Sequence, residues 1–200
     1  MVIFSHNMIK NKSSLNKKID ICIFSTTCRS GLNFLTSCLD SHSEVIIIPS
    51  LRFFSKLYDF TKVKDLKNFK TNNEKKFILN FSTYLYKAGK DNPECKFLNN
   101  SKDKKKFTNI LMEEFKKRND TKFLKKLFFS IHIAFAKFYK MNLRKKKIIV
   151  VSEKSTIFIP FYENLFDNIK ILLLVRNPIN SFAGYKNSYI KNHSSFPPTS

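Results

Sequence analysis

Short apolar runs alternate along the chain with longer stretches whose apolar positions recur at helical spacing. The runs lie at 21–24, 45–48, 148–151 and 171–175. Consecutive apolar residues, several of them β-branched, are typical of strands in a parallel sheet that is covered on both faces. Each of the four runs is therefore predicted to form a buried strand.

The stretches between these runs predict helices. The clearest covers 122–141, where one apolar stripe consists of Leu124, Leu127, Phe128, Ile131, Phe135 and Phe138. Other helical patterns follow the first strand at Leu32, Leu35 and Leu39, and cover 77–85, 107–115 and 161–166. The stripe is interpreted as core packing, and His132 beside it as a surface or satisfied histidine rather than a metal ligand.

Strands that alternate with helices predict an α/β fold of three layers, with a central parallel sheet and flanking helices. Residues 87–106 contain Gly89, a proline and many polar side chains, which predicts a long loop. The polar segment 1–19 is interpreted as a flexible N-terminal lead-in. The rest, 20–200, is interpreted as a single domain with a helical, Lys-rich middle region at about 55–147.

The composition indicates a globular chain with a strong positive field. Hydrophobic residues make up 42% of the 200 positions, and 22 Phe and 7 Tyr are enough to fill a core. A formal net charge of +22 attracts anionic ligands, nucleic acid or acidic glycans, and charge alone does not choose among them. Any single lysine is interpreted as a solvated surface residue.

The cysteines and the N-terminus favour a reducing compartment. No C-x-x-C pair occurs, so the four cysteines are interpreted as reduced thiols: Cys22, Cys28, Cys38 and Cys95. The N-terminus has no apolar segment followed by a small-residue cleavage site, and no run of about 18 apolar residues occurs. A cytoplasmic protein with no membrane span in this chain is therefore expected, and its oligomeric state stays open.

The segment 25–34 carries the first chemical signal, because it leads from the first predicted strand into a helix. That geometry aims backbone N–H groups and the positive end of the helix dipole at one point, where phosphate binds. Gly31 would let the backbone approach the anion, Arg29 would supply charge, and Ser30 and Asn33 would supply donors. A Walker-type triphosphatase is excluded, because the G-x-x-x-x-G-K-[ST] pattern is missing.

Four segments, taken in order, resemble the motifs of one enzyme family. They are Arg29-Ser30-Gly31, Leu39 to Val45 around His42, Glu153-Lys154-Ser155, and the apolar strand ending in Arg176-Asn177-Pro178. Together these segments span residues 21–188. On these motifs the chain resembles the sulfotransferases that use 3′-phosphoadenosine 5′-phosphosulfate (PAPS).

The resemblance implies a P-loop nucleotide-binding-like fold and transfer of a sulfuryl group from PAPS to a hydroxyl or amine of a carbohydrate or small molecule. It implies no metal. It places Arg29, Lys154 and Glu153 in the chemistry of transfer, and Arg176 at the 3′-phosphate, which the paired donors of a guanidinium suit. The cofactor contacts that it implies are Arg29, Ser30, Gly31, Leu32, Asn33, Phe34, Arg176 and Gly184.

The sequence departs from the family at two informative positions. Ser50 stands where a glutamate base is usual in glycan sulfotransferases, which leaves His42, Glu44 and Glu153 as substitutes. Gly184 stands where a serine usually contacts the 3′-phosphate. These departures keep an alternative open, a catalytically impaired sulfotransferase-like protein that binds a nucleotide or anion.

Because few residues follow the last motif, a compact variant and a C-terminally truncated chain are both open. A specific nucleic-acid-binding module is disfavoured, because the aromatic residues follow core-like helical spacing.

Overall fold

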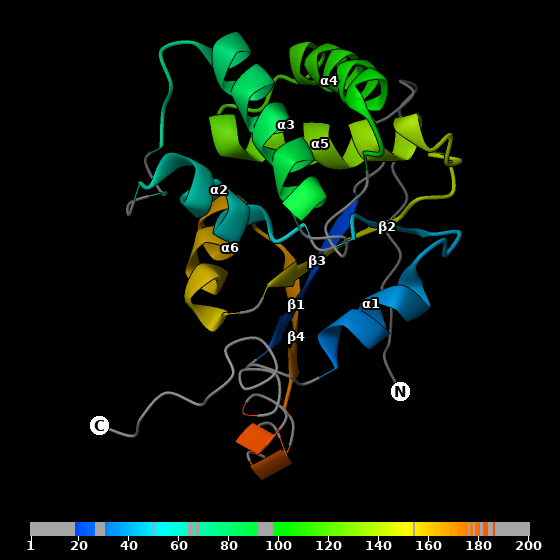
Figure 1. Ribbon diagram of the computed structural model, residues 1–200, viewed down its shortest axis with the longest axis vertical. Coiled ribbons are helices and arrows are strands. Elements are labelled where there is room, and N and C mark those ends of the chain that lie inside the picture. The colour runs from blue at the N-terminus through cyan, green and yellow to red at the C-terminus, as the bar shows by residue number, and fades with distance from the viewer. Residues whose placement is uncertain are drawn as a thin grey trace.

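The fold is α/β, built around one four-stranded sheet in which all strand pairs are parallel (Figure 1). The structure, a computed structural model, describes residues 19–26, 31–49, 51–63, 66, 69–91, 98–153, 155–175, 177, 179–180, 182–183 and 186. The prediction of an α/β fold with a central parallel sheet and flanking helices is confirmed.

The four strands coincide with the four apolar runs. They are β1 (Asp20–Thr26), β2 (Val45–Ile47), β3 (Ile148–Glu153) and β4 (Ile169–Leu174). Their order in the sheet is β2-β3-β1-β4. Because every pair is parallel, the carboxyl ends of all four strands meet at one edge of the sheet.

The helices match the predicted positions more closely in the middle of each element than at its ends. They are α1 (Leu32–Leu39), α2 (Phe53–Thr61), α3 (Glu74–Asp91), α4 (Ser101–Lys116), α5 (Phe123–Phe138) and α6 (Ile159–Leu165), with the 3₁₀ turn η2 (Thr156–Phe158) before α6. The predicted loop at 87–106 is wrong at both ends, since α3 and α4 extend into it. One glycine, Gly89, costs a helix only about 1 kcal/mol, and the buried residues Ile78, Phe81 and Leu85 hold α3 in place.

Alternating strand residues form two apolar clusters on the two faces of the sheet. One cluster joins Phe24 and Val150 to Leu32 of α1. The other, much larger, joins Ile23 and Val151 to α2, α5 and α6. Figure 1 accordingly shows α1 on one side of the sheet and α2 and α6 on the other, with α3, α4 and α5 grouped together at one end.

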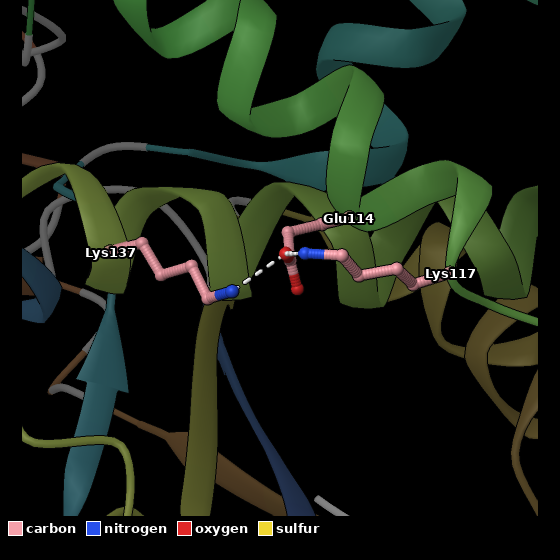
Figure 2. A network of polar contacts seen from close by, with 3 residues as sticks. All are labelled: Glu114, Lys117 and Lys137. Carbon is pink, nitrogen blue, oxygen red and sulfur yellow. Dashed lines mark hydrogen bonds and ion pairs between the residues drawn. The ribbon is translucent and has the colours of Figure 1, made fainter.

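A buried carboxylate links two of these helices. Glu114 of α4 accepts hydrogen bonds from Nζ of Lys137 in α5 at 2.7 Å and from Nζ of Lys117 at 3.0 Å (Figure 2). Burial alone raises the pKa of this carboxyl, but the two lysines outweigh that effect and lower it. The ion pairs therefore favour the charged form of Glu114 in the folded chain.

The prediction that β4 is covered on both faces is wrong for the described residues. Ile171, Leu172 and Leu173 are 39%, 45% and 55% exposed, although they form a continuous apolar run. β4 is an edge strand whose one described neighbour in the sheet is β1. An apolar run thus predicted the strand correctly, but burial depends on which elements pack over it, and that is not encoded locally.

His132 is buried among aromatic residues of α5 and has a hydrogen-bond partner. Its Nδ1 lies 2.7 Å from the carbonyl oxygen of Phe128, and burial lowers its pKa to about 4. The imidazole is therefore neutral near pH 7 and donates from Nδ1 to that carbonyl. The interpretation of His132 as a satisfied histidine is confirmed.

Three further observations concern the described part of the chain only. Its helices include none with the length and apolar character needed to cross a membrane. Its His, Cys, Asp and Glu side chains form no group of three or more that could hold a metal ion. Its two cysteines, Cys22 and Cys38, are free thiols, whereas Cys28 and Cys95 lie outside the described residues.

Candidate functional site

The chain leaves two neighbouring strands toward opposite faces of the sheet. After β1 it enters α1, which packs on one face, and after β3 it enters η2 and α6, which pack on the other. β1 and β3 are adjacent, with Ser25 beside Glu153 in register. In open α/β sheets, ligands bind outside the carboxyl ends of the strands at such a switch point. The candidate site therefore lies at the carboxyl ends of β1 and β3.

Gly31 has the backbone conformation that the predicted anion loop needs. Its φ of +89° lies in the left-handed region, which side-chain-bearing residues rarely adopt. A Cβ added there would meet no atom within 4 Å, so the requirement for glycine is conformational rather than steric. Gly31 is the N-cap residue of α1 and has no side chain with which to cap the helix.

The next three predicted cofactor contacts, Leu32, Asn33 and Phe34, differ in their exposure to solvent. Leu32 is buried and packs beneath α1 against the sheet, where it fixes the helix. Asn33 lies on the exposed side, and its carbonyl accepts hydrogen bonds from Thr36 and Ser37. Phe34 is 76% exposed. Leu32 therefore supports α1 through its side chain, and a cofactor would meet only the side chains of the other two.

The other predicted contacts are not placed by the structure. Arg29, Ser30, Lys154, Arg176 and Gly184 lie outside the described residues, as does Ser50. Their roles stay predictions.

Glu153 is the last residue of β3 and is completely buried. Its Oε1 accepts hydrogen bonds from the backbone N–H of Phe54 at 3.0 Å and from the hydroxyl of Tyr162 at 2.8 Å. Its Oε2 accepts from the hydroxyl of Ser55 at 2.6 Å. Phe54 and Ser55 are in the first turn of α2, where Arg52 provides no side-chain cap. Glu153 thus caps α2 from a distance and also ties α6 to the end of β3.

The burial of Glu153 changes its proton affinity. Burial raises the pKa of this carboxyl to about 7, although the hydrogen bonds from Ser55, Tyr162 and Phe54 act in the opposite direction. The same buried environment raises the pKa of Tyr162 well above its usual value, so the phenol keeps its proton. A carboxyl with a pKa near 7 can hold or release a proton under physiological conditions. In this arrangement both of its oxygens already hold α2 and α6, so its catalytic role stays a prediction.

Ser25 adds a second polar group at the same place. It is completely buried, and its hydroxyl has no hydrogen-bond partner among the described residues. Alternation along the two strands puts Ser25 and Glu153 on the same face of the sheet. A buried hydroxyl without a partner costs about 1–3 kcal/mol, and such groups are rare unless a ligand, ion or water satisfies them. Ser25 therefore adds a second buried polar group at the carboxyl ends of β1 and β3.

The two other substitutes for a base lie elsewhere. His42 and Glu44 precede β2, so they lie at the amino edge of the sheet, whereas the candidate site lies at the carboxyl edge. The Nδ1 of His42 accepts from the backbone N–H of Glu44, and Glu44 forms an ion pair with Lys147. The structure therefore brings neither residue to Glu153.

Sequence reasoning missed Ser25, Ser55 and Tyr162 as parts of the site. Ser55 and Glu153 are 98 positions apart in the chain, and their contact depends on how α2 packs over the sheet. Tyr162 lies in an apolar helical pattern that gives no sign of a polar role. A usable signal was the lone glutamate at the end of an apolar strand, because a buried carboxylate requires donors nearby.

Comparisons with protein-family models, with curated proteins and with solved structures found no match to this chain.

Proposed function

We propose that this protein transfers a sulfuryl group from PAPS to a hydroxyl or amine of a carbohydrate or small molecule. The observation that carries the proposal is the strand, loop and helix around Gly31, located at the switch point of a parallel sheet. A glycine with a positive φ directly before a helix suits an anion-binding loop, because the backbone can approach the anion at the positive end of the helix. Three of the four motifs that resemble the PAPS-dependent family lie at or directly after the carboxyl ends of β1, β3 and β4 in the chain, and the fourth, Leu39 to Val45, precedes β2.

The proposed chemistry follows the logic of phosphoryl transfer. The attacking and leaving oxygens lie in line, and positive groups stabilise the charge that develops on the leaving phosphate. Arg29 and Lys154 are the proposed sources of that charge, and Arg176 the proposed ligand of the 3′-phosphate. The fold in this proposal is P-loop-like, with the first turn of α1 facing the 5′-phosphosulfate.

Glu153 enters the proposal through its position directly before Lys154. Its three hydrogen bonds fix the end of β3 against α2 and α6. A fixed strand end limits the positions available to the following residue, which favours a well-oriented cation. Glu153 is also a candidate to accept the acceptor's proton, since its pKa is near 7.

Turnover with sulfate-labelled PAPS tests the proposal. The wild type is expected to release adenosine 3′,5′-bisphosphate and label an acceptor from a panel of glycans, phenols and amines. Arg29→Ala and Lys154→Ala are each expected to lower kcat by at least about a hundredfold while circular dichroism stays unchanged. Arg144→Ala, which removes the same charge from an exposed position near the amino edge, is the matched control. Unchanged turnover in both variants would overturn the assignment of these two cations.

The second candidate is the sulfotransferase-like protein that binds the nucleotide without turnover. The observation that favours it is that both oxygens of Glu153 already accept hydrogen bonds from α2 and α6, so this carboxylate is held in a structural role. The two candidates differ in one outcome. Saturable binding of adenosine 3′,5′-bisphosphate without any labelled product supports the second, and labelled product supports the first.

A further inference from the structure

A cavity of about 590 Å³ lies beside β2, and none of its described lining residues belongs to the candidate site. Its walls come from the turn between α1 and β2, from the segment after α5, from Phe135 within α5 and from Pro49 after β2. The volume is within the range of small-molecule sites, roughly 300–1,000 Å³. The lining residues that matter for its chemistry are Asp40, Phe135, Tyr139, Met141, Lys145 and Lys146.

Lys146 is a buried cation on the wall of this cavity. It is 4% exposed, and its Nζ donates to the carbonyl oxygens of His42 and Val45, each at 2.7 Å. An ammonium has three donors, and these two carbonyls use two of them. In the part of the chain that the structure describes, no carboxylate forms an ion pair with it. Buried charges are normally paired, so an anion in the cavity would supply the missing counter-charge.

The two turns that form the walls have defined shapes. Ser41 and Lys140 have φ values of 63° and 55°, in the left-handed region that residues with a Cβ seldom adopt. Backbone hydrogen bonds hold each turn, from His42 N–H to the Leu39 carbonyl at 3.2 Å and from Met141 N–H to the Ala136 carbonyl at 2.8 Å. Each of these residues directly follows the C-cap of a helix, where the left-handed conformation is a common way for a helix to end, so both turns have a fixed shape.

The opposite wall is aromatic. The ring centroids of Phe135 and Tyr139 are 4.8 Å apart, and Tyr139 is 45% exposed while Phe135 is buried. Met141, whose thioether contacts aromatic rings favourably, lines the same cavity. The cavity thus joins an apolar wall to Lys145 and Lys146, and Asp40 is the one acidic residue among its described lining residues.

We propose that this cavity binds a small aromatic monoanion, with its ring against Tyr139, Phe135 and Met141 and its carboxylate or sulfonate at Lys146 and Lys145. Among the described lining residues, two lysines against one aspartate give a net charge of about +1, which a single negative charge balances. The ring fills the apolar side, and the anion takes the third donor of the Lys146 ammonium. This site is separate from the proposed sulfuryl-transfer site, because its described lining residues include none of those proposed for sulfuryl transfer.

Methyl NMR tests the proposal with benzoate as the probe. The chain has four methionines, of which Met141 lines the cavity and Met112 lies in α4. With methionine methyl groups labelled with ¹³C, millimolar benzoate is expected to shift the Met141 resonance saturably and leave Met112 in place. Acetate lacks the ring and benzamide lacks the charge, so each is expected to bind at least about fivefold more weakly.

Variants separate the proposed site from the general positive field. Lys146→Met and Tyr139→Leu are each expected to raise the Kd of benzoate at least about fivefold, and Lys145→Met about threefold. Lys147→Met removes the same charge from an exposed residue that pairs with Glu44, so the Kd is expected to stay the same. If Lys146→Met unfolds, Tyr139→Leu and Lys145→Met still test the proposal. Both side chains are exposed, so these two substitutions are expected to leave the fold intact. Absence of a saturable Met141 shift, an equal shift of Met112, or equal effects of Lys145→Met and Lys147→Met would each overturn the proposal.

Discussion

Replacing Glu153 with glutamine tests the environment of the buried carboxyl at the end of β3. A glutamine of the same shape can still accept hydrogen bonds from Phe54 N–H and the Tyr162 hydroxyl through its carbonyl oxygen. Its amide can donate to the Ser55 hydroxyl, which rotates to accept. The variant therefore keeps the links to α2 and α6 and removes only the ability to ionise.

The magnitude follows from the two pKa values of the wild type. The folded carboxyl has a pKa of about 7, against 4.5 for an unperturbed glutamate. A raised folded-state pKa stabilises the fold at low pH, and that contribution is lost as the pH rises from about 4.5 through 7. At about 1.4 kcal/mol per pH unit, the wild type loses about 3 kcal/mol from this group across that window. Glu153→Gln does not titrate, so its free energy of unfolding should rise relative to that of the wild type by about the same amount.

Urea unfolding at pH 4.5, 6, 7 and 8 measures this difference. Subtracting the two proteins at each pH removes the titration of every other group, which matters in a chain of net charge +22. Glu163→Gln makes the same chemical change on an exposed residue of α6, and its stability should run nearly parallel to that of the wild type. Parallel wild-type and Glu153→Gln curves between pH 4.5 and 8 would refute the buried, proton-holding environment described for Glu153.

The remaining predictions concern the fold. Glu114→Gln should lower the free energy of unfolding by about 1 kcal/mol at pH 7, a modest loss because Lys117 and Lys137 both reach solvent. Because the pKa of Glu114 is lowered, this loss should fade as the pH falls through and below the folded-state pKa, and a constant loss in urea titrations from pH 7 to pH 2 would contradict it. Leu127→Ala, in the core of α5, should cost about 2–5 kcal/mol, and Leu173→Ala on the exposed edge strand less than about 1.5 kcal/mol. Equal shifts in thermal unfolding would show that β4 is covered in solution.

The sequence was informative wherever one local rule determines the outcome. Apolar runs identified all four strands, and the place of Gly31 between a strand and a helix was evident from the sequence, to which the structure adds its left-handed conformation. The sequence was uninformative where the outcome depends on distant residues. The first turn of α2 is capped by Glu153, 98 and 99 positions further on, so no local pattern at residues 53–61 marks where that helix begins. The exposure of β4 likewise depends on its neighbours rather than on its own residues.

The candidate site shows the same division. Gly31 could be assigned from its place between a strand and a helix, whereas Ser25 gained significance only when its hydroxyl proved to be buried without a partner among the described residues. Glu153 was selected as a residue of the chemistry of transfer, and the structure adds that both of its oxygens hold helices. The parallel register of β1 and β3 is what brings Ser25 beside Glu153.

Paired calorimetry with adenosine 3′,5′-bisphosphate and adenosine 5′-phosphate tests the proposed function most directly. The wild type should bind the bisphosphate saturably, and Arg176→Ala should weaken that binding by about 1.5–3 kcal/mol, the range for hydrogen bonds to charged groups. Its affinity for the 5′-phosphate should barely change, and Arg144→Ala should bind both nucleotides as the wild type does. No saturable binding of the bisphosphate by the wild type, or equal losses for the two nucleotides in Arg176→Ala, would contradict a PAPS site at the carboxyl edge of the sheet.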